Sequence, residues 1–413
     1  MLDPRDHPQT ADRETEPVRT GTALCLSGGG YRASLFHLGA LRRLNELGIL
    51  AKVDTICSVS GGSIIAAHLI DVIVRYYADA NCIPPDEWET KVAVPFRRFA
   101  ARDIRSAPIF KRFLLPWNWF RRSTQVRALE TRYRRHLTQL RLIDLPEKPN
   151  LILCSTDITF GANFIISRNG TGDYQAGYYV TLPEWPLARA VAVSSCFPPI
   201  FNPLPIRPRP SELSGGQYPP GKERDRLVSG LSLSDGGVYD NLGLEPAWKD
   251  HRSVLVSDGG APFVRKISRA PWSLMMRYIG IATNQSLAVR KRWLIDKYVQ
   301  NDLDGTYWGI ASATERYGEK SPRGYSKRLA AEVISKVRTD LDGFLPSEMA
   351  VLENHGYLLA EAAVRRHAPD LQGDNEAELK IPHPEWMDEA KVRTALAESH
   401  RRLSLNRLLG RLD

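Results

Sequence analysis

Residues 23–63 constrain the fold more than any other stretch, because they contain two glycine-rich turns, each between an apolar run and a helical pattern. The apolar residues 23–27 resemble a buried strand and precede the first turn, at residues 28–30. The second turn, at residues 58–62, follows the strand-like residues 55–57 and leads into another apolar helix. Strand, tight turn and helix, repeated in this order, are typical of the start of a parallel sheet in an α/β fold.

Both turns suit acyl-transfer chemistry. Ser60 occupies a small-x-Ser-x-Gly frame, close to the nucleophile elbow that exposes a serine hydroxyl at a helix N-terminus. Its small neighbours Ser58 and Gly62 allow the strand and helix backbones to pass close together. The glycines of the first turn can direct successive backbone N–H groups at one point, which is what an oxyanion hole requires.

The residues alone leave other interpretations open. A small-x-Ser-x-Gly frame by itself is most often an ordinary turn. The spacing Gly28-x-Gly30-x-x-Ala33 also fits a dinucleotide-binding fingerprint, with a strand before it and a helix after it. That fingerprint needs a ribose-binding acid about 20 residues further on, whereas Asp54 comes before the second strand. The two turns in tandem are more specific than either alone and favour acyl transfer.

A carboxylate partner for Ser60 is expected at the end of another strand. Asp235 follows the strand-like residues 231–234 and begins an Asp-Gly-Gly turn with Gly236 and Gly237, and Asp258 begins a second such turn. The two acids therefore compete for this role. None of the nine histidines stands at a strand end in a turn, where the base of a catalytic triad belongs. A Ser–Asp dyad, in which the carboxylate accepts the serine proton, is the economical hypothesis.

Four motifs in this order resemble the patatin-like phospholipase family, whose wider group includes enzymes of the cytosolic phospholipase A2 type. They are Ser27-Gly-Gly-Gly-Tyr-Arg32, Ser58-Val-Ser-Gly-Gly62, Phe197-Pro-Pro199 and Asp235-Gly-Gly237. The resemblance covers roughly residues 22–260. It implies a three-layer α/β/α fold with a mainly parallel central sheet, a Ser–Asp dyad without histidine, and hydrolysis of lipid acyl esters.

The resemblance also implies a role for each matching residue. Ser60 is the nucleophile, and Asp235 rather than Asp258 is the base, because Asp235 opens the Asp-Gly-Gly-x-Tyr-Asp-Asn frame. Arg32 orients the glycine loop or contacts a substrate phosphate, with an ordinary ion pair as the alternative. The pattern departs from the family at Ser58 and Ala33, which both replace glycine without removing a reacting group. The expected oxyanion loop consists of Gly28, Gly29 and Gly30.

We expect three parts along the chain. Residues 1–20 are charged and contain proline, so we expect disorder there and no signal peptide. Residues 21–265 form the catalytic domain, with a basic and aromatic helical insertion at about 90–140 and a Pro-rich loop at 202–230. The remaining residues, 266–413, form a mainly helical region packed on that domain. This region contains an amphipathic basic run at 272–298 and a Leu- and Arg-rich tail.

The charge of the chain indicates an anionic partner. The net charge is +9, and residues 96–135 carry twelve Lys or Arg and two acids among aromatic side chains. This segment is either a helical cap with an ordinary aromatic core or a surface that docks on an anionic membrane. Nucleic acid is not expected, because no zinc finger or RNA-binding motif accompanies the charge.

The cysteines and the hydropathy of the chain indicate the cellular compartment in which the protein acts. The five cysteines are scattered and mostly lie in apolar runs, which indicates buried, reduced thiols. The longest apolar run, residues 63–74, is too short to span a bilayer. We therefore predict a cytoplasmic protein that associates peripherally with membranes. We expect no metal or cofactor, because there is neither metal-ligand spacing nor an acidic calcium loop.

These features together predict a serine acyl hydrolase that cleaves fatty-acyl esters of membrane phospholipids or lysophospholipids. One alternative is a soluble carboxylesterase or thioesterase with the same dyad. Another is a non-enzymatic nucleotide-binding signalling module that uses the turn at residues 28–30 for phosphates. A partner protein or activating ligand that acts through residues 96–135 or through the tail is a further hypothesis.

Overall fold

The computed structural model of the chain describes residues 19–77, 82–104, 124–198, 201–263, 267, 271–372, 377–397 and 399.

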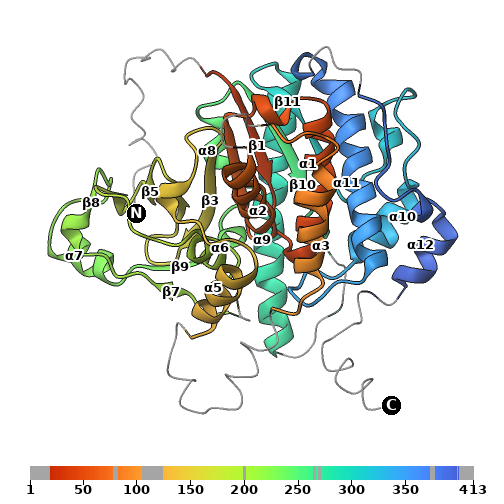
Figure 1. The fold of residues 1–413 in the computed structure, drawn as a ribbon. Helices are drawn as coiled ribbons and strands as arrows, with labels where there is room; N and C mark the ends of the chain where they lie inside the picture. The colour runs from red at the N-terminus through yellow and green to blue at the C-terminus, as the bar shows by residue number, and fades with distance from the viewer. Residues whose placement is uncertain are drawn as a thin grey trace.

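Five neighbouring parallel strands form the centre of the sheet (Figure 1). The strand order reverses at β1, which has β2 on one side and β10 on the other. In open α/β sheets, ligands bind at the carboxyl ends of the strands beside such a point. In spatial order, the strands are β11 (Asp304–Gly309), β10 (Ser253–Asp258), β1 (Thr22–Leu26), β2 (Thr55–Val59) and β3 (Asn150–Asp157).

Antiparallel strands continue the sheet beyond β3. In order, they are β4 (Ala162–Ile166), β5 (Thr171–Asp173), β6 (Gly177–Tyr179) and β8 (Leu213–Ser214). A further strand, β9 (Ser232–Asp235), pairs antiparallel with residues 155–157 of β3 and with the short β7 (Leu204–Pro205). Since β4 pairs with the opposite edge of β3, strands β2 and β9 share one edge of β3 and meet end to end.

Helices cover both faces of the sheet, because the strands alternate apolar side chains between two hydrophobic cores. On one face, Leu24 and Leu26 of β1 pack with α1 (Gly30–Glu46), α2 (Gly61–Tyr76) and α11 (Pro346–His367). On the other face, Cys25 contributes to a smaller core with α8 (Glu245–Trp248) and α9 (Pro271–Val299) (Figure 1). This arrangement confirms the predicted three-layer α/β/α fold.

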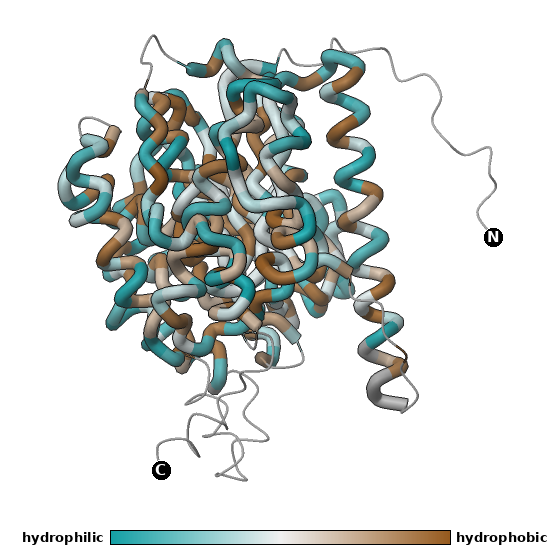
Figure 2. Tube along the Cα trace, turned by 90° about the vertical axis from the view of Figure 1, so that its right-hand side faces the viewer, coloured by the Kyte–Doolittle hydropathy of each residue, from teal (hydrophilic) through white to brown (hydrophobic). Residues whose placement is uncertain are grey.

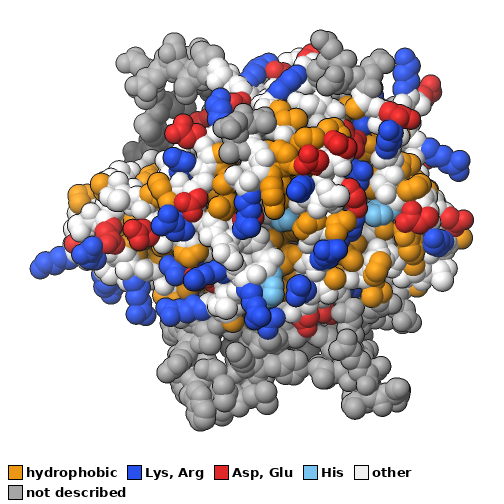
Figure 3. Space-filling view, viewed as in Figure 1, with side chains coloured by type: hydrophobic (Ala, Val, Ile, Leu, Met, Phe, Trp, Pro, Cys, Tyr) orange, Lys and Arg blue, Asp and Glu red, His pale blue; other side chains and the backbone are white. Residues whose placement is uncertain are grey.

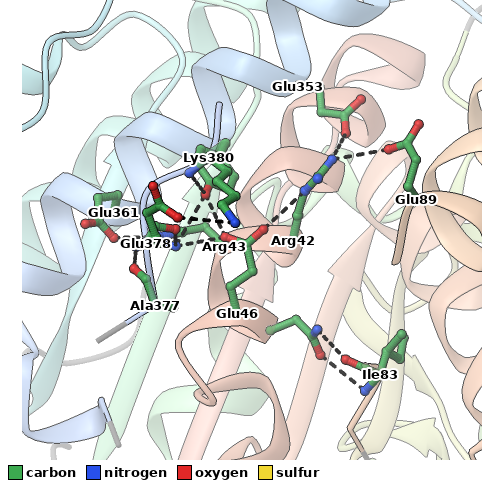
Figure 4. A network of polar contacts seen from close by, with 12 residues as sticks. Arg42, Arg43, Glu46, Ile83, Glu89, Glu353, Glu361, Ala377, Glu378 and Lys380 are labelled. Atoms are coloured by element: carbon green, nitrogen blue, oxygen red, sulfur yellow. Dashed lines mark hydrogen bonds and ion pairs between the residues drawn. The ribbon is translucent and has the colours of Figure 1, made fainter. Parts of the chain in front are cut away.

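Helices α1 and α11 pack so closely that their backbones touch. A Cβ atom on Gly39 would lie 1.8 Å from the carbonyl oxygen of Glu353, and one on Gly356 would lie 1.8 Å from that of Phe36. A buried polar network fixes the same pair of helices (Figure 4). Within it, Arg43 of α1 donates to Glu361 of α11 at 2.7 Å. The C-terminal region is therefore built into the α/β/α fold, and it also supplies β11 at the edge of the sheet.

Two segments differ from the sequence expectations. The stretch 202–230 is not one long loop, because it forms β7, β8 and α7 (Lys222–Ser229), which close the antiparallel side of the sheet. The basic, aromatic insertion contains α3 (Val94–Ala100) and α5 (Thr124–His136), whereas residues 105–123 lie outside the described part. The expected disordered segment (except residues 19 and 20) and the tail from residue 400 also lie outside it.

The C-terminal region is mainly helical, as expected, with α10 (Lys327–Glu332) and α12 (Glu389–Leu396) beside α9 and α11. Helix α6 (Leu187–Ser194) ends shortly before the Phe197-Pro-Pro199 motif. Across the described ranges, no helix is both long enough and apolar enough to cross a membrane.

Candidate active site

Ser60 lies on the sharp turn between β2 and α2. Its backbone has φ 50° and ψ −113°, a left-handed conformation that is strained for a residue with a side chain. The turn is tight because the following backbone touches its neighbours. A Cβ atom on Gly61 would lie 2.2 Å from the carbonyl oxygen of Gly30, and one on Gly62 would lie 2.1 Å from that of Leu26. The small residues of the elbow are therefore required by contact with the first turn.

A series of hydrogen bonds between serine residues stabilises the elbow. The Ser60 N–H donates to Ser194 Oγ at 3.0 Å, and Ser194 Oγ donates to the carbonyl oxygen of Cys154 at 2.7 Å. Ser63 Oγ lies 2.8 Å from Ser194 Oγ and donates to Ser58 Oγ at 3.0 Å. Ser58, which replaces the first elbow glycine, thus has a hydrogen-bonding role. Sequence reasoning missed Ser194, because nothing in α6 marks it as a neighbour of the elbow.

The meeting of β2 and β9 brings Asp235 to Ser60. Val59 pairs with Cys154 of β3, and Asp235 pairs with Ser155, the next residue of the same strand. Asp235 is 1% exposed, its Oδ1 atom accepts the Gly237 N–H at 2.7 Å, and its Oδ2 atom has no hydrogen-bond partner among the described residues. Burial raises the pKa of Asp235 to about 7, against the lowering effects of the Gly237 N–H and the Ser60 hydroxyl.

Gly236 allows this close approach. A Cβ atom at that position would lie 2.4 Å from the carbonyl oxygen of Cys154 in β3. Asp235 also caps the short 3₁₀ turn Gly236–Val238 that follows β9.

The competing acid, Asp258, has other partners. Its Oδ2 atom lies 2.5 Å from Lys291 Nζ and accepts a hydrogen bond from the Tyr307 hydroxyl at 2.6 Å. Burial acts to raise the pKa of Asp258, but the Lys291 ammonium and the hydrogen bonds from Tyr307 and the Gly260 N–H together hold the pKa below its usual value. Asp258 lines a separate cavity of about 710 Å³ between α9 and the end of β11. The structure thus brings Asp235, and not Asp258, to Ser60.

The glycine loop presents two free backbone donors. Gly28, Gly29 and Gly30 line the same cavity as Ser60 and Asp235. The Gly28 N–H donates to the carbonyl oxygen of Asn241 at 3.0 Å and is therefore occupied. No hydrogen bond joins the N–H of Gly29 or Gly30 to another described residue. Asn241, the last residue of the Asp-Gly-Gly-x-Tyr-Asp-Asn frame, also lines the cavity, although no role was assigned to it from the sequence.

The Arg32 side chain is bound by backbone carbonyl groups from distant parts of the chain. Its guanidinium is buried and donates to the carbonyl oxygens of Gly259 at 2.9 Å, Ser335 at 2.8 Å and Val337 at 2.9 Å. Burial lowers its pKa to about 10, although the Asp258 carboxylate acts in the opposite direction. No ion pair joins Arg32 to a described carboxylate, and Arg32 does not line the cavity, so its contacts match the loop-orienting alternative.

The cavity that contains Ser60 has a volume of about 600 Å³ and an apolar wall. Phe197, from the predicted Phe-Pro-Pro motif, lines it together with Phe201, Phe263, Leu287 and Leu341. Such a wall accommodates a hydrocarbon chain, and the polar groups at its base are those of the elbow and the glycine loop.

None of the described histidines lines this cavity. His37 is buried behind the glycine loop, where its ring nitrogens lie 2.8 Å from Ser257 Oγ and 3.0 Å from the carbonyl oxygen of Ser27. Burial lowers the pKa of His37, and likewise that of His355, to about 4. Within the part of the chain that the structure covers, no cluster of three or more His, Cys, Asp or Glu side chains is arranged to hold a metal ion.

A family model described as patatin-like phospholipase matches residues 24–248, more than half of the chain. The chain belongs to the patatin-like phospholipase family. This membership confirms the family that the four motifs predicted and supports lipid acyl hydrolase activity. No curated protein matches the chain.

Solved structures of patatin-like folds are similar at low sequence identity. Human GIVD cytosolic phospholipase A2 in complex with methyl gamma-linolenyl fluorophosphonate is 14% identical, with a TM-score of 0.45, and the match covers 93% of this chain and 60% of that chain. VipD from Legionella pneumophila is 14% identical, with a TM-score of 0.33, and the match covers 83% of this chain and 66% of that chain. The chain therefore spans about three fifths of the length of the human enzyme.

Proposed function

We propose that the protein hydrolyses fatty-acyl esters of phospholipids or lysophospholipids, with Ser60 as nucleophile and Asp235 as base. The observation that carries this proposal is the end-to-end meeting of β2 and β9 on one edge of β3. It places the strained Ser60 and the buried Asp235, whose Oδ2 atom is unpartnered among the described residues, in one cavity.

The reaction begins when Ser60 Oγ attacks the acyl carbonyl carbon and Asp235 accepts the hydroxyl proton. The negative charge that develops on the carbonyl oxygen is met by the N–H groups of Gly29 and Gly30. The intermediate collapses to an ester of the fatty acid with Ser60, and the alcohol leaves with the proton from Asp235. Water, deprotonated by Asp235, then attacks this ester and releases the fatty acid, and the proton returns to Ser60.

The surroundings of the dyad support a lipid substrate. The aromatic and aliphatic wall of the cavity suits an acyl chain, because its burial there removes apolar surface from water. The net charge of +9 favours an anionic membrane surface as the place of reaction. We accordingly propose that the protein acts in the cytoplasm and associates peripherally with the membrane.

The test is fatty-acid release from anionic and neutral phospholipid vesicles by the wild type and three variants. We expect Ser60→Ala and Asp235→Asn to lose at least about 10³-fold in rate while remaining folded. Asp258→Asn serves as the matched control, and we expect it to retain most of the activity. An active Asp235→Asn variant would contradict the dyad. A wild type that ignores vesicles and cleaves a short soluble ester through Ser60 would identify a soluble esterase instead.

A further inference from the structure

Helix α9 contains an unusually uncharged stretch for a surface helix. Over residues 271–289, Arg277 is the only charged residue, whereas residues 290–297 carry five. A solvent-facing helix of a globular protein normally places charged residues on its outer side. The uncharged stretch forms more than half of the helix. Whether its side chains are buried or exposed therefore indicates whether it belongs to the core or forms an interaction surface.

One side of this stretch forms a wall of the candidate active-site cavity. Arg277, Gly280, Thr283, Asn284 and Leu287 line that cavity. Arg277 lies over the ring of Phe263, with 4.2 Å between its guanidinium carbon and the ring centroid. The inner side of α9 is therefore part of the candidate active site.

The opposite side, which we call the outer face of α9, is exposed and carries no charge. Tyr278 is 67% exposed, Val289 is 55% exposed and Met275 is 49% exposed. All exposed residues described between positions 275 and 289 are uncharged, namely Met275, Tyr278, Ile279, Ile281, Ala282, Gln285, Ser286 and Val289. The expectation of an amphipathic helix was wrong for this part, because apolar side chains face both the cavity and the solvent.

Further exposed apolar side chains line the cavity or precede α9 in the chain. Phe263 is 40% exposed, Phe197 is 45% exposed, and both line the cavity. Ile267, between them and the start of α9 in the chain, is 86% exposed. Exposed apolar surface of this extent on a soluble domain marks an interaction site.

The position of α9 fits contact with an extended surface. Figure 2 shows α9 at the right-hand edge of the molecule. Figure 1 places the N-terminal end of this helix beyond the sheet. On the face seen in Figure 3, by contrast, Lys and Arg are interspersed with Asp and Glu. Helix α9 therefore lies at the edge of the domain.

We propose that the outer face of α9 docks on a phospholipid bilayer and sets the cavity mouth against the lipid. This inference rests on the proposed function, because the inner side of the same helix lines a cavity that takes an acyl chain. An exposed apolar helix face lies in the interface between headgroups and hydrocarbon.

For the basic and aromatic segment at residues 96–135, membrane docking was one of two interpretations, and its described part is less suited to this role. Phe96 is 0% exposed and Phe99 is 3% exposed, so both belong to the core. Helix α9 combines lipid contact and substrate access in one element, since the same turns contribute to both its inner and outer sides.

The experiment compares the double variant Tyr278→Glu, Val289→Glu with Val180→Glu, which changes an apolar residue of similar exposure, 68%, on the antiparallel side of the sheet. Binding to vesicles of phosphatidylcholine and phosphatidylglycerol is measured by co-sedimentation in the Ser60→Ala background, so that hydrolysis does not alter the vesicles. With Ser60 intact, hydrolysis of a short soluble ester reports on the fold and on the site.

We expect the double variant to bind vesicles at least about tenfold more weakly, because two carboxylates must leave water at the interface. The Val180→Glu control should bind like the parent, and both should cleave the soluble ester at the wild-type rate. Unchanged vesicle binding by the double variant would overturn the proposal. A wild-type dimer that the double variant dissociates would also overturn it, by showing that a second copy covers this face.

The two proposals fail in different ways. If phospholipid hydrolysis requires Ser60 but is unchanged by Tyr278→Glu and Val289→Glu, the proposed docking face is wrong and the proposed function stands. If the protein releases no fatty acid from any lipid but loses vesicle binding in the double variant, the docking face stands and the proposed function fails.

Discussion

The backbone N–H of Ser60 donates a 3.0 Å hydrogen bond to the hydroxyl of Ser194, which lies 134 residues further along the chain. The bond joins the strained turn of the elbow to the end of α6, and the Ser194 hydroxyl in turn donates to the backbone of β3. The position of the proposed nucleophile is therefore set by three separate segments of the chain.

We expect Ser194→Ala to lower the rate of ester hydrolysis roughly 10–100-fold without touching a reacting group. The substitution leaves the Ser60 N–H buried and unpaired, at a cost of about 1–3 kcal/mol, and lets the nucleophile shift. The measurement is kcat for a short ester together with urea unfolding. Ser63→Ala is the matched control, because it removes a neighbouring hydroxyl and keeps the Ser60–Ser194 bond; a larger loss in this control would contradict the assignment.

The rate of hydrolysis should rise with pH through about 7. Burial raises the pKa of Asp235 to about 7, and only its deprotonated form accepts the Ser60 proton. At lower pH the carboxyl is protonated, and the rate should fall about tenfold for each further pH unit. The measurement is kcat/KM for a short ester as a function of pH. A rate that stays constant below pH 7 would identify another base.

A second pair of buried acids should make the stability of the protein depend on pH. Asp157 and Asp173 each have a buried Oδ2 atom without a hydrogen-bond partner among the described residues. Burial, followed by the charge of Asp173, raises the pKa of Asp157 to about 7, and burial also raises that of Asp173. The folded state therefore holds a proton that the unfolded state releases at a lower pH.

It follows that the pair contributes stability at low pH that is lost as the pH rises from about 4 through about 7. We expect Asp157→Asn to reduce this dependence, because the amide does not ionise. The measurement is the free energy of unfolding of both proteins across this range. Equal pH dependence in the two proteins would show that the pair does not share a proton.

Replacing Arg32 by Lys should destabilise the protein by roughly 2–4 kcal/mol, because a single ammonium cannot reach three separate carbonyl oxygens. We propose that Arg32 orients the glycine loop, in which case the relative loss of kcat should be the same for a phospholipid and for a neutral short ester. A rise in KM confined to the phospholipid would instead indicate that Arg32 contacts the substrate phosphate.

Much of the fold could be predicted because its signals are local. The apolar run, the turn and the helix follow one another directly at β1 and α1, and again at β2, Ser60 and α2. Asp235 was assigned from the family frame. Its position opposite Ser155 was not predictable, because strand pairing between β9 and β3 depends on contacts nearly 80 residues apart.

The contacts of Arg32 and the exposed side of α9 could not be predicted either. The carbonyl groups that bind Arg32 are backbone atoms of residues 335 and 337, and backbone acceptors carry no sequence signal. The exposed side of α9 was misjudged because a helical pattern shows which residues share a face and not which face meets solvent.

The contact between Arg32 and residue 337 also has a consequence for the timing of synthesis. The two residues are 305 positions apart, so at roughly 5–20 residues per second the ribosome needs about 15–60 s to pass from one to the other. During that interval the glycine loop has left the ribosome but lacks its anchors. If the protein hydrolyses lipid esters as we propose, a nascent chain would therefore stay inactive until about four fifths of the polypeptide has been made.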